Sequence, residues 1–463
     1  MFALPDAFSD KMKMLMKDEW KAFADAFDAP AHKGIRRNTL KIDEQSFKRL
    51  VSFAGTPVPW CQTGYEIDSE IRPGKHVAYY AGLYYVQEPT AMIPAEALSP
   101  KPGDMVLDLC AAPGGKTTQL ACMLDGEGVI ASNELVTSRS KILAENTERM
   151  GIVNSVVTSA FPEKLLPAFA GAFNKIQVDA PCSGEGMFRK NPDAAKQWSP
   201  ERVSACAERQ KKLMATVDKL LACGGEVVYS TCTFSPEENE QVMEAMLETG
   251  RYEAVPLELP GIVGRGRPEW TLHGTKAVSS ALRVMPHEVP GEGHFIAKLR
   301  KTADASNQPP LDGKRSKKTA FVRADKKTIK YLKTFCDETD MAFPQGEILR
   351  VGDVLFTPPE GFNTARLSGM RLLRCGIPLA EVKKNRVEPT HTLAMTLSPE
   401  NFGNVYDTDD DEIAFAYLKG EPLTAPVKGW CLVCWHGFSL GFGKGDGRII
   451  KNHYPKGLRI YKK

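Results

Sequence analysis

The sequence predicts an α/β protein whose central domain is a doubly wound, mainly parallel sheet of the Rossmann type. Apolar segments typical of strands alternate with helix signals between residues 98 and 299, and this alternation favours parallel pairing. A glycine turn follows the first of these segments, as in a nucleotide-binding β-turn-α unit. At 463 residues the chain suggests about three domains. The strands expected after the glycine turn are residues 128–132, 155–159, 175–181, 225–232 and 294–299.

The glycine turn lies in the segment LDLCAAPGGKTTQLA, residues 107–121, which resembles a nucleoside-triphosphate loop only at its end. A Walker A loop needs a glycine five positions before the glycine of Gly-Lys-Thr, and Cys110 stands there. Pro113 also lacks the N–H that a phosphate cradle uses. The segment therefore predicts a strand, a tight turn and a helix over residues 116–123, without a triphosphate site.

A nucleoside without a polyphosphate is the ligand that this turn predicts. Glu134 follows the second expected strand, and its distance from Gly115 suits hydrogen bonds to ribose hydroxyls. S-adenosylmethionine fits this pattern, because it carries an adenine, a ribose, and a carboxylate where a nucleotide would carry phosphates.

Several segments carry signals for the ends of helices. Residues 5–27 place apolar side chains at mostly helical spacing and predict one amphipathic helix. Ser199-Pro200 predicts the start of a long helix, with Gly224-Gly225 at its end. The segment SPEE, residues 235–238, predicts another helix that begins with a capping box.

Basic residues gather in three segments, 32–42, 298–333 and 444–463, although the net charge is only +3. The second segment carries twelve Lys or Arg against three Asp. Three basic segments around one catalytic domain indicate a polyanionic partner.

The composition argues against a membrane protein and against a disulfide scaffold. No apolar run approaches the length of a membrane span, and charges interrupt the apolar positions of the N-terminal segment, so no signal peptide is expected. Eleven Cys without a framework spacing indicate a reducing, cytoplasmic compartment. Cys431 and Cys434 form a lone Cys-x-x-Cys in an apolar run, which predicts the core of a strand and no metal. We expect a monomer.

Two cysteines follow expected strand ends, on the rim where a doubly wound sheet builds its site. Cys182 lies in VDAPCSGEGMFRK and Cys232 in VVYSTCTFSPEENE. A single free cysteine is most often a small buried hydrophobe. Two of them beside a methyl-donor site predict thiolate chemistry, and on this reasoning either can attack. Cys232 also lies shortly before an expected helix N-terminus, which favours a thiolate.

Methylation of carbon 5 of a pyrimidine needs both a thiolate and a methyl donor. A thiolate that adds to carbon 6 makes an enamine, which pushes electron density onto carbon 5. Carbon 5 then takes the methyl group, a base removes the carbon-5 proton, and the thiolate leaves. Asp179 is placed to polarise the ring at N3 and at its exocyclic group by hydrogen bonding.

Three motifs together, LDLCAAPGGKTTQLA, DAPCSGEGMFRKNP and YSTCTFSPEENE, resemble the Sun-type family of RNA cytosine-5 methyltransferases. RRNTLK, YYVQEPTAM and RVMPHEVPGEGHF are similar to further blocks of that family, so the resemblance covers residues 30–300. The segments 371–395 and 435–459 resemble the C-terminal region of bacterial RsmF-like enzymes, which act on 16S ribosomal RNA and carry a PUA-like RNA-binding domain.

The resemblance implies a class I methyltransferase core with smaller RNA-binding modules on either side. The implied domains are an N-terminal α/β RNA-binding domain at 1–92, the core at 93–300, a basic linker with an intermediate α+β domain at 301–385, and a PUA-like domain at 386–463.

The resemblance also implies roles for single residues. Cys232 would be the nucleophile, Cys182 would assist product release, and Asp179 would lie beside both the base and the methyl donor. Glu134 would hold the ribose of S-adenosylmethionine. The methionine end of the cofactor would be wrapped by Cys110, Ala111, Ala112, Pro113, Gly114, Gly115 and Lys116. RNA contacts are expected from Lys190, Arg37 and Asn38.

The sequence departs from the family pattern at two places. Ser159-Ala160 stands where the family commonly has an acidic residue near the adenine, and His294 stands where many relatives carry an aromatic residue. Three alternatives therefore stay open: a tRNA cytosine-5 methyltransferase, a methyltransferase for protein or small molecules with inert cysteines, and an RNA-binding ribosome assembly factor with weak or no catalysis.

Overall fold

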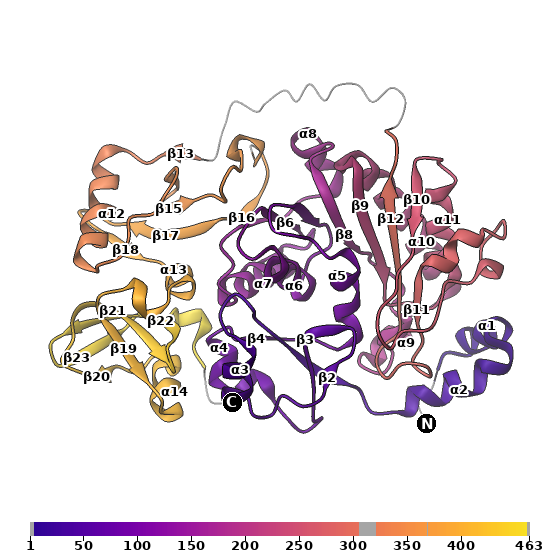
Figure 1. The fold of residues 1–463 in the computed structure, drawn as a ribbon, viewed down its shortest axis with the longest axis horizontal. Coiled ribbons are helices and arrows are strands. Elements are labelled where there is room, and N and C mark those ends of the chain that lie inside the picture. Colours follow the sequence, from indigo (N-terminus) through magenta and orange to yellow (C-terminus); the bar gives the residue numbers. More distant parts are fainter. Residues whose placement is uncertain (1–3, 305–320, 368, 461–463) are drawn as a thin grey trace.

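The computed structural model describes residues 4–304, 321–367 and 369–460, which form four sheets with their covering helices. Figure 1 shows the central sheet in the middle of the molecule, the N-terminal helices on one side of it and the two C-terminal sheets on the other. Part of the basic segment 298–333 lies outside the described residues, including Lys314, Arg315, Lys317 and Lys318.

The N-terminal segment forms two helices where the sequence predicts one. α1 (Asp6–Met16) and α2 (Trp20–Asp25) are separated at Lys17, whose φ of 50° breaks the helix. Phe8 and Phe23 are fully buried and pack against Phe188 and Phe234 of the central domain. The amphipathic pattern is therefore correct, and its apolar face covers the loops that follow Cys182 and Cys232.

An antiparallel sheet with strand order β2-β3-β1-β4 follows these helices. Its strands are β1 (Lys33–Arg37), β2 (Pro57–Val58), β3 (Cys61–Ile67) and β4 (Tyr84–Val86), with α3 (Glu44–Leu50) and α4 (Val77–Tyr80) beside them. Asp43 starts α3, because its carboxylate accepts a hydrogen bond from the N–H of Ser46.

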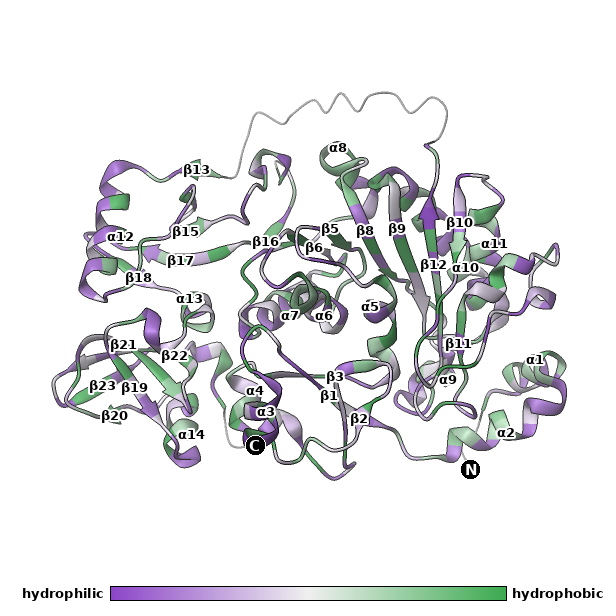
Figure 2. Cartoon of the chain, in the orientation of Figure 1, coloured by the Kyte–Doolittle hydropathy of each residue, from purple (hydrophilic) through white to green (hydrophobic). Residues whose placement is uncertain are grey.

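The central sheet has nine strands and confirms the predicted Rossmann-like core. Its order is β10-β12-β9-β8-β5-β6-β7-β16, with β11 paired to β12. The parallel strands are β5 (Met105–Asp108), β6 (Val129–Asn133), β7 (Ser155–Thr158), β8 (Phe173–Asp179) and β9 (Leu221–Thr231). The antiparallel strands are β10 (Tyr252–Val255), β11 (Leu282–Val284), β12 (His294–Lys301) and β16 (Leu372–Cys375). Figure 2 shows hydrophobic residues concentrated in the central strands, as expected for a sheet covered on both faces.

The helices of this domain follow the sequence signals at some ends and depart from them at others. They are α5 (Ile93–Leu98), α6 (Gly115–Leu124), α7 (Thr137–Arg149), α8 (Leu166–Phe169), α9 (Pro192–Lys196), α10 (Pro200–Leu220) and α11 (Glu240–Leu247). Ser199 caps α10 as predicted, because its hydroxyl accepts a hydrogen bond from the N–H of Arg202. The predicted end at Gly224-Gly225 is wrong: α10 stops at Leu220 and both glycines lie within β9.

The capping box predicted at residues 235–238 is also wrong. Residues Pro236–Glu238 form a 3-10 turn before α11, and the side chain of Ser235 caps no helix. The Ser235 hydroxyl instead donates to Glu185, which lies in a different loop. Ser235 therefore bonds to Glu185, which is distant in the sequence, and not to the backbone of its own helix.

Two further sheets lie at the C-terminal end of the chain. The first contains β13 (Val322–Arg323), β14 (Leu349–Val351), β15 (Val354–Thr357), β17 (Ile377–Val382) and β18 (Val387–Pro389), with α12 (Lys326–Glu338). The second contains β19 (Val405–Thr408), β20 (Leu423–Thr424), β21 (Lys428–Trp435), β22 (Phe438–Asp446) and β23 (Ile449–Asn452), with α13 (His391–Thr396) and α14 (Asp411–Lys419). Cys431 and Cys434 are buried in β21, which confirms the prediction of a strand core.

Strand β16 leaves this C-terminal region and joins the central sheet at its open edge, antiparallel to β7. Arg374 of β16 is buried against the core, where its guanidinium donates to the carbonyl of Ile152. The expected separation of residues 301–385 from the core is therefore incomplete. None of the helices within the described ranges is both long and apolar enough to cross a membrane.

Candidate active site

The two cysteines singled out from the sequence meet at the carboxyl ends of β8 and β9. These strands are parallel neighbours, and their register pairs Asp179 with Ser230. Cys232 follows directly after β9, and Cys182 lies in the loop after β8. Their Sγ atoms are 3.3 Å apart. Both line a cavity of about 530 Å³ at this rim.

The thiol of Cys182 is held in its protonated form. Its hydrogen bond with the Cys232 sulfur, together with burial, raises the pKa of Cys182 well above that of an ordinary thiol. A thiol that keeps its proton is a proton donor rather than a nucleophile.

Asp179 and Lys116 form an ion pair at the floor of the site, with 2.8 Å between Oδ2 and Nζ. Oδ1 of Asp179 accepts a hydrogen bond from the hydroxyl of Ser230 at 3.0 Å. Burial alone would raise the pKa of Asp179, but the Lys116 ammonium and these hydrogen bonds hold it below its ordinary value. Asp179 thus stays ionised, and 36% of its side chain remains accessible.

The glycine loop after β5 is tied to α7 through its carbonyl groups. Arg139 donates to the carbonyl of Ala112 at 2.7 Å, and Asn146 donates to that of Pro113 at 2.9 Å. Gly114 has a φ of 114°, and a Cβ there would lie 3.2 Å from Leu143, so both conformation and space favour glycine. These contacts hold the backbone of the loop against α7.

Cys110 and Ala111 form the buried side of this loop. Burial raises the pKa of the Cys110 thiol, which therefore stays neutral. The N–H of Ala111 donates to the carbonyl of Asn133 at the end of β6. Cys110 can thus offer a ligand its backbone, but not a thiolate.

Asp108, at the end of β5, is a site residue that reasoning from the sequence missed. It is fully buried and accepts a hydrogen bond of 2.6 Å from Thr117. Burial raises its pKa to about 7. Its second oxygen, Oδ1, has no hydrogen-bond partner among the described residues. The position of an acid at the last residue of the first strand was the available signal.

Glu134 lies at the end of β6 and lines the same cavity. Its Oε1 accepts a hydrogen bond from the N–H of Val136 at 2.9 Å, and its Oε2 lies 3.3 Å from Nη1 of Arg139. The carboxylate is almost fully buried, so these contacts fix its direction. Arg139 was not anticipated from the sequence.

The segment at Ser159-Ala160 supplies no acid, but the residues after it line the cavity. Phe161 and Pro162 border the cavity, as does Leu135, and Phe161 leaves 60% of its surface exposed. Glu163, three residues after Ala160, lines the cavity beside them, so this wall combines apolar side chains with one acid. No period or motif marks Phe161 in the sequence, so it was missed.

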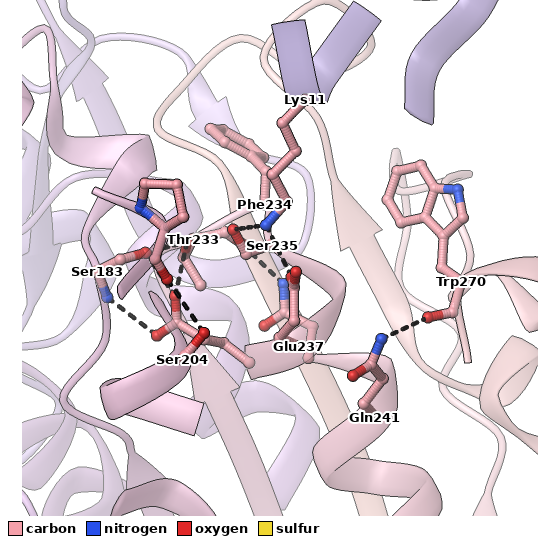
Figure 3. Close-up of polar contacts among 12 residues, drawn as sticks. Lys11, Ser183, Ser204, Thr233, Phe234, Ser235, Glu237, Gln241 and Trp270 are labelled. Carbon is pink, nitrogen blue, oxygen red and sulfur yellow. Dashed lines mark hydrogen bonds and ion pairs between the residues drawn. The ribbon is translucent and has the colours of Figure 1, made fainter. Parts of the chain in front are cut away.

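The loop that carries Cys232 is held by buried polar contacts from several directions. Glu185 accepts hydrogen bonds from the N–H groups of Phe234 and Ser235 at 2.7 and 2.9 Å. Lys11 of α1 reaches into this loop, where it contacts Ser235 and Glu237 at 2.9 and 2.8 Å (Figure 3).

The loops after β8 and β9 are also joined to each other. The hydroxyls of Ser183 and Thr233 lie 2.7 Å apart, and both contact the carboxylate of Glu238. Figure 3 shows Ser183 and Thr233 side by side. The two cysteine loops therefore form one rigid unit.

The predicted RNA-binding residues have different surroundings. Lys190 is 55% exposed, and its Nζ lies 3.7 Å from Glu292. Asn38 is fully buried and donates to the carbonyls of Gly82 and Met150, which contradicts the predicted contact with RNA. Arg37 is half-buried, with its guanidinium on the carbonyl of Ile42.

Arg36, the neighbour of Arg37, was not singled out from the sequence. Its side chain points toward the start of α6, at the end of the glycine loop. Its guanidinium is fully buried and donates to the Gly115 carbonyl and the Thr118 hydroxyl at 3.1 and 2.7 Å. Gln87 accepts a third hydrogen bond at 3.0 Å. Alternation along β1 turns Arg36 and Arg37 to opposite faces, and no signal in the sequence indicates which of them faces the site.

Comparison with protein families gives matches along most of the chain. Residues 95–300 match the model of 16S rRNA methyltransferase RsmB/F, and residues 4–89 match the N-terminal domain of 16S rRNA methyltransferase RsmF. Residues 334–397 match the first C-terminal domain of the RsmF rRNA methyltransferase, and residues 404–460 match the methyltransferase RsmF PUA domain.

Two solved structures share the fold of the central region. The methyltransferase homolog protein from Pyrococcus horikoshii is 31% identical, with a TM-score of 0.57, over 65% of this chain and 96% of that chain. NSun6 from Pyrococcus horikoshii, solved with SFG, is 23% identical, with a TM-score of 0.57, over 65% of this chain and 100% of that chain. The second likeness concerns the fold alone.

Curated relatives match over nearly the full length. Ribosomal RNA small subunit methyltransferase F of Vibrio vulnificus is 34% identical over 98% of this chain and 97% of its own. The protein of the same name from Shewanella sediminis is 35% identical over 93% of this chain and 91% of its own. With these relatives and four matching models, the chain belongs to the RsmF family of 16S ribosomal RNA methyltransferases.

Proposed function

We propose that this chain transfers a methyl group from S-adenosylmethionine to carbon 5 of a cytosine in 16S ribosomal RNA, through a covalent bond between a cysteine and carbon 6. The observation that carries the proposal is the pair of thiols 3.3 Å apart, which line one cavity together with Asp179, the carboxylate that is paired with Lys116. Carbons 5 and 6 are adjacent in the ring, so two neighbouring sulfurs can serve both.

The residues around the cavity fit S-adenosylmethionine. Glu134 offers a fixed carboxylate to the ribose, and the apolar wall of Leu135 and Phe161 suits an adenine. Oδ1 of Asp108, which no described residue contacts by a hydrogen bond, and the ordered loop of residues 110–116 suit the charged methionine end. When bound, the cofactor supplies an electrophilic methyl group on its sulfonium.

Cys232 is assigned as the nucleophile and Cys182 as the residue that assists release. The family resemblance implies these roles, and the 3.3 Å between the two sulfurs lets both reach the adjacent carbons 5 and 6. The Cys232 sulfur adds to carbon 6, and the methyl group joins carbon 5. A base then takes the carbon-5 proton, the electron pair of that bond restores the double bond between carbons 5 and 6, and Cys232 leaves as a thiolate.

Asp179 is assigned to the pyrimidine ring. Its ionised carboxylate accepts hydrogen bonds, so it suits the exocyclic amine of cytosine and a protonated N3. Lys116 keeps this carboxylate ionised and directed. Lys190, exposed at the rim, is placed to meet the RNA backbone.

The adduct experiment tests the covalent mechanism. Cys232→Ala should be inactive and form no adduct with RNA. Cys182→Ala should turn over poorly and accumulate a protein–RNA adduct on a denaturing gel with RNA and S-adenosylmethionine, because elimination stalls. Cys223→Ala, at an exposed cysteine, is the matched control and should behave like the parent. An adduct in Cys232→Ala but not in Cys182→Ala would reverse the assignment.

Nucleoside analysis tests the product and the target. RNA is isolated from a strain that lacks the enzyme and is incubated with the parent enzyme. 5-Methylcytidine should then appear in the 16S ribosomal RNA and not in the tRNA. Methyl transfer to tRNA alone would favour the tRNA alternative. No transfer to either, with 5-fluorocytidine RNA failing to trap the parent enzyme, would leave a role in RNA binding without catalysis.

We also propose that RNA is bound outside the core as well as at the cavity. Lys444, Arg448 and Lys451 are exposed on β22, β23 and the turn between them, within the region matched by the PUA model. Basic side chains on one exposed hairpin suit phosphate groups. A single chain contains the whole cavity, so we propose a monomer, to be tested by light scattering.

A further inference from the structure

His294 stands at the first position of β12, directly beside the strand that carries the nucleophile. β12 and β9 are antiparallel, and their register pairs Phe295 with Thr231. Residues that face each other across an antiparallel pair lie on the same side of the sheet, with Cβ atoms about 5 Å apart. Continued by one residue past its last pair, this register sets His294 beside Cys232, and the imidazole is close enough to Lys116 and Asp179 for their charges to act on it.

The hydrogen bonds of Nδ1 determine which nitrogen of His294 carries the proton. Nδ1 lies 3.0 Å from the carbonyl oxygen of Glu292 and 3.0 Å from the hydroxyl of Thr90. A carbonyl oxygen only accepts hydrogen bonds, so Nδ1 must donate to it. The Thr90 hydroxyl can accept from Nδ1 as well, because its own proton is directed to Glu88 or to the Glu292 carbonyl.

The imidazole is neutral, so Nε2 carries a lone pair. Burial, with the nearby Lys116 ammonium, lowers the pKa of His294 to about 4. The charged groups that act on the ring are those of the catalytic rim, Lys116 and Asp179, together with Lys190. The His294 side chain is buried and held through Nδ1, and none of the hydrogen bonds among the described residues uses Nε2.

We propose that His294 is a specificity-determining residue whose Nε2 accepts a hydrogen bond from the exocyclic amine of the target cytosine. The inference rests on the proposed function, and it names the group that selects cytosine. Uracil carries a carbonyl oxygen at the same ring position. The lone pairs of that oxygen would face the lone pair of Nε2, and no hydrogen bond could form. The amine of cytosine has two hydrogens, so Asp179 can accept one while His294 accepts the other. The mismatch leaves a buried acceptor unpaired, which is a strong form of discrimination.

A comparison of two substrates with two side chains tests this hydrogen bond. The substrates are RNAs with either cytosine or 2-pyrimidinone, which lacks the amine, at the target position. His294→Phe should lower kcat/KM for the cytosine RNA by roughly tenfold to a hundredfold, the cost of removing one buried hydrogen bond. The same variant should lose much less on the 2-pyrimidinone RNA, because that hydrogen bond is already absent. His294→Gln, whose amide oxygen can accept in place of Nε2, should restore part of the activity on cytosine.

A purely structural role for His294 predicts a different result. His294→Phe would then lose the same factor on both substrates, and such equal losses would overturn the proposal. ¹⁵N NMR of the full-length protein gives a second reading: a protonated Nε2 in the parent would also overturn it. S-adenosylmethionine affinity should be the same in all variants, which checks that the fold is retained.

The failure of this inference can be distinguished from failure of the proposed function. The proposed function fails if the parent enzyme makes no 5-methylcytidine and is not trapped by 5-fluorocytidine RNA. The inference alone fails if the parent does both and the two substrates respond equally to His294→Phe.

Discussion

The buried ion pair between Arg283 and Glu240 gives the sharpest test of how the loop that carries Cys232 is positioned. Their side chains are 2% and 0% exposed. The guanidinium binds the carboxylate through two hydrogen bonds of 2.7 and 2.5 Å, and a third reaches the carbonyl of Phe234 at 3.0 Å. Phe234 lies two residues after Cys232, so the ion pair holds the loop that carries Cys232 through the carbonyl of Phe234.

Arg283→Met should destabilise this region by about 3–5 kcal/mol, because it leaves the Glu240 carboxylate buried without a counter-charge. Among the described residues, only the N–H of Arg267 would still donate to that carboxylate, at 3.2 Å. A multidomain chain does not unfold in one step, so the loss of stability is best measured in this region alone. Amide hydrogen exchange over residues 231–247 should accelerate by roughly 150-fold to 5,000-fold, the factor that corresponds to this loss, and methyl transfer should fall with it.

The double variant Arg283→Met with Glu240→Leu is the control that isolates the charge. It removes both members of the pair and should recover much of the protection, since an apolar pair in place of a buried ion pair is often neutral. Two outcomes would refute the reasoning: an Arg283→Met protein that exchanges like the parent, or a double variant as unprotected as the single one.

The other predictions concern acid stability, the cofactor and RNA. Glu226 contacts three cations, which lower its pKa from 4.5 to about 2 although burial opposes this. Above pH 4.5 these contacts add up to about 3 kcal/mol to the free energy of unfolding, and this contribution is lost as the pH falls toward 2. Glu226→Gln should therefore be less stable than the parent at pH 7 in urea titrations and should not lose this contribution in acid. Glu134→Ala should weaken S-adenosylmethionine binding by about 1.5–3 kcal/mol in calorimetry, without changing RNA affinity; equal cofactor affinity would remove Glu134 from the site. Replacing Lys444, Arg448 and Lys451 by Ala should flatten the dependence of log K on log salt by up to about 0.7–0.9 for each phosphate that these side chains neutralise; an unchanged slope would remove this hairpin from the RNA interface.

The central fold could be predicted from the sequence because its signals are local. Each parallel strand is an apolar run followed by a turn, and the glycine loop after β5 lies in one continuous segment. The parallel order then brings strand ends together, which is why Cys182 and Cys232 could be placed on one rim before any distance was known.

The errors fall where residues far apart in the sequence compete with local signals. Ser235 has the sequence of a capping box, but Glu185 from another loop takes its hydroxyl. Asn38 lies in a basic segment, yet its amide binds two buried carbonyls, one of them at the end of α7. Neighbours in the chain alone decide neither of these choices.

The edge strand β16 bears on how the protein is made. During synthesis the core strands emerge first, up to Lys301, and β7 then stands at the border of the sheet with its N–H and C=O groups unpaired. An open border of this kind invites pairing with another chain. It is closed only when residues 372–375 have left the ribosome and folded back, carrying Arg374 into the core. The catalytic domain therefore matures last at its edge, and a nascent chain that stalls before this point is the form most exposed to aggregation.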